Sequence, residues 1–168
     1  YDAAVKYLTE KGLYISYYDN FKPMMWISLL ENAMYNDAGI DITKSMESIM
    51  TSKAKKANKK ILEVENIDIQ LGVFDNISDE LANVMILSYT QADPSEQAKA
   101  NNRLYEQWKH GEAIEDTDDE EIPDECKEDY EKYSKAMLTD RNKGMADKAE
   151  EYMNDGKKVF FMVGAAHM

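Results

Sequence analysis

The chain has 168 residues, of which 43% are hydrophobic and 32% charged, and its formal net charge is −13. A surface with this excess of carboxylates repels phosphate backbones, so we expect no nucleic-acid partner. The longest apolar stretches are far shorter than the roughly 20 residues that a membrane-spanning helix requires. The length predicts a single domain over residues 1–168.

Helical patterns dominate the first third of the chain. Residues 2–11 form a short candidate helix that Gly12 ends. Pro23 opens a second helix, which is apolar on nearly all sides and is therefore expected to be buried. Asp41 is the expected N-cap of a third helix, whose apolar stripe consists of Ile42, Met46, Ile49 and Met50.

Four more helices are predicted further along. Ser78 and the sequence Asp93-Pro94 are typical helix starts, and Gly111 is a typical stop. Two helices follow Pro123, the last ending at Gly156. Residues 112–125 are crowded with acidic side chains, but they lack the glycine and the ligand spacing of a calcium loop, so we expect a solvated acidic loop.

Two runs resemble buried strands, at residues 60–65 and 159–163. Strands separated by helices favour a helix-rich α/β fold with a partial parallel or mixed sheet. Two strands alone make a poor sheet. Either further strands lie outside this sequence, both ends of which look trimmed, or the chain is mostly a helical layer.

Candidate chemistry lies at the carboxyl ends of these runs, where open α/β sheets usually bind ligands. His167 follows the small residues Gly164-Ala165-Ala166, and a neutral imidazole there can bind a metal or transfer protons. Glu65 ends the other run, on the same strand face as Glu63, and can act as a base or a metal ligand. Arg141 can hold a carboxylate or an anionic substrate. Each of the three could also be an ordinary surface residue.

The other reactive residues carry weaker signals. Cys126 is the only cysteine, and its acidic neighbours disfavour the thiolate, so we expect no catalytic role and no internal disulfide. His110 is expected to be a cation near a helix C-terminus. Phosphate loops, dinucleotide fingerprints, HExxH zinc motifs and nucleophile elbows are missing from the sequence.

Several short segments follow one another in the order of a known family: Phe21-Lys22-Pro23, Gly39-Ile40-Asp41, residues 60–66 with Gln70-Leu71, Trp108-Lys109-His110-Gly111, Arg141-Asn142 with Met145-Ala146, and residues 163–168. On these motifs the chain resembles the TraB/GumN family, which includes the Tiki metalloproteases and is related in fold to erythromycin esterase and the haem-binding ChaN proteins. Glu63 and Asn66 depart from the family pattern, which has glycine and threonine there.

The resemblance implies an active site made of two G-x-x-H motifs, a glutamate and an arginine. Carried over to this sequence, the glutamate is Glu65, the arginine is Arg141, and the second G-x-x-H motif ends at His167. The first motif is expected upstream of Tyr1. His167 and Glu65 would be the metal ligands in this chain, with Mn²⁺ or Co²⁺ as plausible ions. With one histidine missing, we expect this chain to bind divalent metal weakly or not at all.

The resemblance thus predicts a metal-dependent hydrolase, most plausibly a peptidase, acting on a peptide or small-molecule substrate and incomplete in this chain. It is compatible with an exported or membrane-anchored extracytoplasmic protein. Two alternatives stay open. One is a non-catalytic peptide-binding or regulatory protein of the pheromone-shutdown type. The other is a purely helical interaction domain, which the absence of a sheet between residues 60–65 and 159–163 would support.

Overall fold

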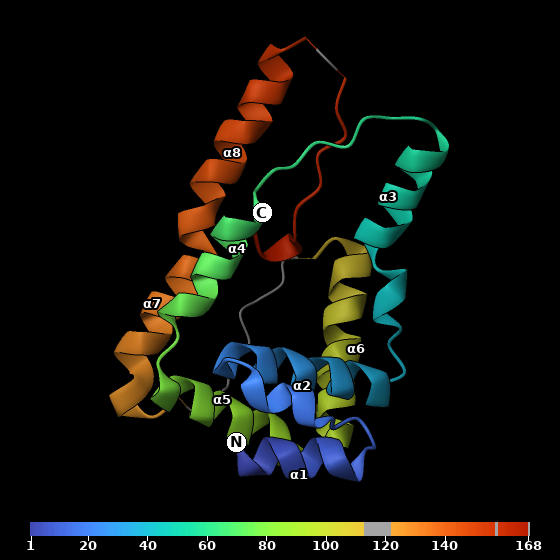
Figure 1. Ribbon diagram of the computed structural model, residues 1–168. Coiled ribbons are helices and arrows are strands. Elements are labelled where there is room, and N and C mark those ends of the chain that lie inside the picture. The colour runs from blue at the N-terminus through green and yellow to red at the C-terminus, as the bar shows by residue number, and fades with distance from the viewer. Residues whose placement is uncertain (113–121, 157, 168) are drawn as a thin grey trace. The chain divides into compact units, whose positions relative to one another are not determined.

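The computed structural model of the protein describes residues 1–112, 122–156 and 158–167. Within these residues the regular structure consists of α-helices and short 3-10 helices, without a β-strand (Figure 1). The chain divides into two compact units. Unit 1 comprises Tyr1–Ile42 and Ile77–Tyr130, and unit 2 comprises Thr43–Asn76 and Glu131–Met168.

Unit 1 is a group of helices arranged around α2. It contains α1 (Asp2–Glu10), α2 (Pro23–Asp37), α5 (Asp79–Gln91) and α6 (Pro94–His110). Helix α2 contacts α1, α5 and α6, and α1 also contacts α5. Most of the apolar sequence after Pro23 is buried as predicted, whereas Met25 is 38% exposed. The largest side chains that are completely buried all belong to this unit: Leu8, Ile27, Leu30 and Leu81.

Most helix ends in unit 1 follow the capping signals in the sequence. Ser78 Oγ accepts a hydrogen bond from the Leu81 N–H at 3.1 Å and starts α5. The Asp93 side chain accepts from the Ser95 N–H at 2.7 Å and starts α6, with proline at the first position. Gly111 ends α6 in a left-handed conformation, with φ of 68°. These starts and stops were predicted because capping is a local interaction.

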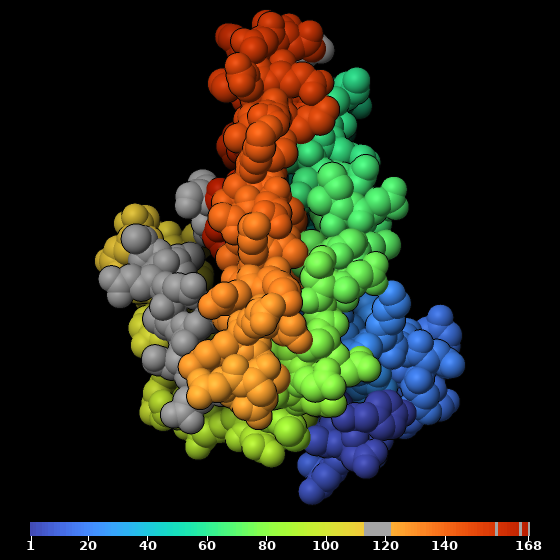
Figure 2. Space-filling view, turned by 90° about the vertical axis from the view of Figure 1, so that its left-hand side faces the viewer, coloured from blue at the N-terminus to red at the C-terminus, as the bar shows by residue number. Residues whose placement is uncertain are grey.

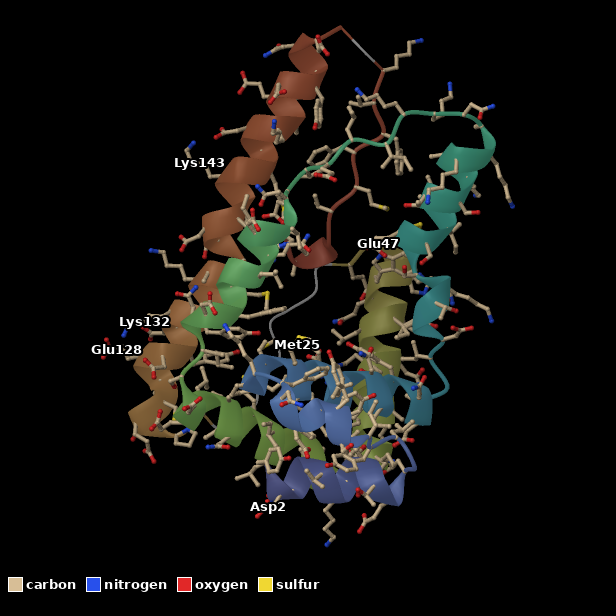
Figure 3. The ribbon with its side chains drawn as sticks, viewed as in Figure 1. Asp2, Met25, Glu47, Glu128, Lys132 and Lys143 are labelled. Atoms are coloured by element: carbon tan, nitrogen blue, oxygen red, sulfur yellow. The ribbon has the colours of Figure 1, made fainter. Side chains whose placement is uncertain are left out.

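Unit 2 contains α3 (Met46–Lys56), α4 (Ile67–Val73) and α8 (Thr139–Asn154), and the division between the units falls inside α7 (Lys127–Met137). Helices α4 and α8 lie side by side, α4 in green and α8 in orange to red, in Figures 1 and 2. The α3 helix starts at Ser45, whose Oγ accepts from the Ser48 N–H, so the prediction of Asp41 as N-cap was wrong. The predicted apolar stripe of α3 is largely exposed.

The prediction of an α/β fold with a sheet was wrong. Residues 60–65 and 159–163 form no strand, and no backbone hydrogen bond joins these two described segments. A parallel sheet needs several strands whose apolar residues are covered on both faces. Here Ile61 is 49% exposed and Phe160 is 74% exposed. Two apolar runs are too few to cover each other, so the helices alone make the regular structure of the described residues.

The predicted acidic loop falls largely outside the described residues, which resume at Ile122. Next to it, Cys126 is buried in unit 1, in the short 3-10 helix Asp124–Cys126. None of the helices in the described part of the chain combines the length and the apolar character needed to cross a membrane.

Candidate functional site

Glu65 and Arg141 form a bidentate ion pair in unit 2, although they lie 76 positions apart in the sequence. Arg141 Nε donates to Glu65 Oε1 at 2.9 Å and to Oε2 at 3.2 Å. Arg141 Nη2 donates to Oε2 at 2.6 Å. Two parallel N–H bonds between a guanidinium and a carboxylate fix the orientation of both groups. The two predicted site residues are therefore brought together in one defined geometry.

Local structure places each partner of this pair. Glu65 comes immediately before Asn66, whose side chain caps α4 by accepting from the Ile69 N–H at 2.9 Å. Arg141 lies in the first turn of α8, and its Nη1 donates to the Met137 carbonyl oxygen at 2.9 Å, at the end of α7. The guanidinium is thus held from two sides, by a carboxylate and by a backbone carbonyl.

The pair is largely shielded from water. The Glu65 side chain is 7% exposed and the Arg141 side chain is 16% exposed. The hydrogen bonds to Glu65 raise the pKa of Arg141 above its ordinary value, although burial opposes this shift. Removing either member of a shielded pair destabilises the folded state, because a single buried charge without its partner is strongly unfavourable.

His167 lies in the same unit and is held by Asn142. The distance between His167 Nδ1 and Asn142 Oδ1 is 2.7 Å. The last residues curl into a 3-10 turn, in which the His167 N–H donates to the Gly164 carbonyl at 2.9 Å. A Cβ atom at Gly164 would lie 3.6 Å from His167 Cδ2, an ordinary contact distance. The G-x-x-H motif therefore forms a turn that brings its histidine to the start of α8.

The charges of the ion pair act on this histidine. Burial of the imidazole and the positive charge of Arg141 lower the pKa of His167 below its ordinary value, while Glu65 opposes the shift. Both effects favour the neutral form of the imidazole. A neutral imidazole can accept a proton or bind a metal through its unprotonated nitrogen.

An open groove of about 430 Å³ adjoins the ion pair within unit 2. Glu65 and Arg141 line one part of it, and the remaining wall is mainly apolar, with contributions from Val64, Ile69, Gly72, Val73, Ala136 and Gly144. Pockets that bind small molecules or side chains combine such apolar walls with a few polar groups. The groove could therefore take an apolar group beside the charged pair.

The described residues do not by themselves fit a metal site. They contain no group of three or more His, Cys, Asp or Glu side chains that could hold an ion. Both carboxylate oxygens of Glu65 already accept from Arg141, and His167 has one ring nitrogen engaged with Asn142. A metal site usually needs at least three protein ligands. Metal dependence thus stays a prediction of the family resemblance.

The other candidate residues lie outside this arrangement. The Glu63 side chain is exposed, and its backbone carbonyl accepts from the Tyr152 hydroxyl at 2.7 Å, so Glu63 and Glu65 do not share an environment. His110 ends α6, with its Nε2 3.4 Å from Glu106 Oε2. Burial raises the pKa of the Cys126 thiol, and the charge of Glu125 adds to this shift, so burial matters more than the acidic neighbours from which a disfavoured thiolate was predicted.

Asn142 is the site residue whose role the sequence did not reveal. It follows Arg141 in the Arg-Asn motif, but an asparagine at a helix start has many ordinary uses, and capping is the commonest. The only signal in the sequence was its place inside a family motif. Its contact with His167 depends on the turn at Gly164 and therefore required the structure.

The model of the TraB/PrgY/gumN family matches residues 1–168. The chain belongs to this family. No curated protein and no solved structure matches it. Family membership covers both units of the chain, and it includes the motifs that contain Glu65, Arg141 and His167. The predicted family resemblance is thereby confirmed, whereas the helical structure departs from the sheet that was expected with it.

Proposed function

We propose that this TraB/PrgY/gumN protein is a hydrolase that cleaves peptides, with its reacting groups in unit 2. The observation that carries the proposal is the bidentate Glu65–Arg141 pair next to a neutral His167 whose pKa the pair influences. Groups with perturbed pKa values and specific charge partners are typical of catalytic sites. The three residues are also those that the family motifs single out.

Each group has a role that its geometry supports. His167 is the base, because a neutral imidazole can take a proton from an attacking water. Arg141 orients the Glu65 side chain through its hydrogen bonds to both carboxylate oxygens. Glu65 Oε1 accepts one of the bonds from Arg141 and Oε2 accepts two, so Oε1 retains a lone pair for a water molecule. The adjoining groove takes an apolar side chain of the peptide.

One variant tests the proposal, together with a matched control. Hydrolysis of a casein digest by the natural protein that contains this chain is followed by mass spectrometry, with and without added Mn²⁺. We expect His167→Ala to lower the rate roughly 10²- to 10⁴-fold, the range for loss of a general base. His110→Ala, which changes the only other histidine, should have no effect. Equal rates for the wild-type protein and His167→Ala would refute the proposal.

A second candidate function is peptide binding without turnover. The groove beside the ion pair favours it, because an apolar wall can hold a peptide side chain without any proton transfer. The absence of a sheet in the described residues is also what a helical interaction domain would show. If the protein only binds peptides, or is a helical interaction domain, the casein peptides would survive incubation with the wild-type protein. Any peptide binding would then not depend on His167.

A further inference from the structure

The hydrogen bond between His167 and Asn142 defines which imidazole nitrogen carries the proton. A neutral imidazole has one N–H donor and one acceptor nitrogen. Asn142 Oδ1 is a carbonyl oxygen and can only accept, and it lies 2.7 Å from His167 Nδ1. With the amide oxygen facing the ring, a neutral imidazole can make this hydrogen bond only as an Nδ1–H donor, which leaves Nε2 with its lone pair. An imidazole side chain free in water prefers the other tautomer, with the proton on Nε2.

We propose that Asn142 is a positioning residue, which holds the neutral His167 side chain in the tautomer protonated at Nδ1 so that Nε2 is the reactive nitrogen. The inference rests on the proposed function for its catalytic meaning, but the tautomer itself can be measured without turnover. Partners that fix the tautomer and orientation of a reactive histidine are common at catalytic and metal sites.

The structure holds both partners of this bond in place. Asn142 lies in the first turn of α8, where the helix fixes its backbone. The backbone N–H of Asn142 donates a hydrogen bond to the Leu138 carbonyl oxygen at 3.2 Å. His167 is fixed by the turn to Gly164. The ring therefore has little freedom to exchange Nδ1 for Nε2 at Asn142. Adjacent residues on a helix point in different directions, so Arg141 and Asn142 reach separate partners.

An asparagine suits this position better than an aspartate. Both side chains offer an oxygen that accepts from Nδ1–H. An aspartate would add a negative charge beside Arg141 and compete with Glu65 for the guanidinium. It would also favour the protonated imidazolium, which cannot act as a base. The neutral amide orients the imidazole and leaves the Glu65–Arg141 pair intact.

The test uses ¹⁵N NMR of the ring nitrogens at about pH 8, where imidazole side chains are neutral. In the wild-type chain we expect a protonated Nδ1 and an unprotonated Nε2 for His167. Asn142→Ala should shift the population toward the tautomer protonated at Nε2, whereas Asn142→Asp, whose carboxylate also accepts from Nδ1–H, should keep Nδ1 protonated. His110 serves as the internal reference, and Asn154→Ala, at the end of the same helix, is the matched control.

Two results would overturn the inference. One is a wild-type spectrum with the proton on Nε2, which requires no variant to fold. The other is an Asn142→Ala chain with wild-type helix content and an unchanged tautomer. For peptide hydrolysis we expect Asn142→Ala to lower kcat roughly 10- to 100-fold with little change in KM. If the protein turns out not to hydrolyse peptides, the NMR spectrum should still show the tautomer protonated at Nδ1. Only the predicted effect of Asn142→Ala on kcat would then be lost.

Discussion

Replacing Arg141 by leucine should strongly destabilise unit 2, because Arg141 is a member of a largely shielded ion pair. The variant removes every bond that Arg141 makes to Glu65 and to the Met137 carbonyl. It leaves the Glu65 carboxyl group without its partner, with only 7% of its side chain exposed. Removing one partner of a shielded ion pair costs about 3–5 kcal/mol, because the remaining charge is not compensated.

Urea unfolding followed by circular dichroism measures this loss. With a slope of about 1–3 kcal/mol per molar urea, a loss of 3 kcal/mol lowers the midpoint by about 1–3 M. Both tryptophans, Trp26 and Trp108, belong to unit 1, so their fluorescence reports that unit separately. Arg103→Leu, which changes the exposed arginine on α6, should change the free energy of unfolding by no more than about 0.5 kcal/mol.

The double variant Glu65→Leu/Arg141→Leu separates the charge effect from a simple loss of packing. Replacing both members of a shielded pair by apolar residues is often neutral or stabilising. We therefore expect the double variant to be more stable than Arg141→Leu alone. An Arg141→Leu midpoint equal to that of the wild type, or a double variant less stable than the single one, would refute the reasoning.

Three further outcomes follow from the structure. The folded state lowers the pKa of His167, so the unfolded chain binds this proton more readily. The stability that the neutral imidazole contributes is complete above about pH 6.5 and is lost as the pH falls toward the lowered value. The urea midpoint should therefore drop more between about pH 7.5 and 5 in the wild type than in His167→Gln, and equal drops would contradict the shift. Cys126, which is buried with a raised pKa, should react with a thiol reagent such as Ellman's only as fast as the protein unfolds. Calorimetric titration with Mn²⁺ should give no binding in the submicromolar range, because the described residues supply no three-ligand group; tight binding would disprove this.

The sequence predicted the helices where their signals are local. Ser78, Asp93 and Gly111 act on neighbouring backbone groups, so their effects can be seen from a few residues at a time. The sheet was a different kind of prediction, since a strand exists only when another strand pairs with it. Residues 60–65 and 159–163 have the composition of strands, but neither finds such a partner in the described chain.

The candidate site was predicted in its residue types and not in its geometry. Family order singled out Glu65, Arg141 and His167, and the structure brings them into one unit. Glu65 and Arg141 are 76 positions apart, so their spacing in the sequence does not show that they form a bidentate ion pair. The contact of Asn142 with His167 likewise depends on the turn between Gly164 and His167, which the prediction of a strand over residues 159–163 did not address.

The most direct test of the account compares two neighbouring carboxylates. Glu65 pairs with Arg141, whereas the Glu63 side chain is exposed. Glu65→Gln and Glu63→Gln are therefore matched changes at the two positions, measured by hydrolysis of the same casein digest. We expect Glu65→Gln to abolish most of the hydrolysis and Glu63→Gln to retain it. Full activity of Glu65→Gln would contradict the claim that the Glu65–Arg141 pair belongs to the active site.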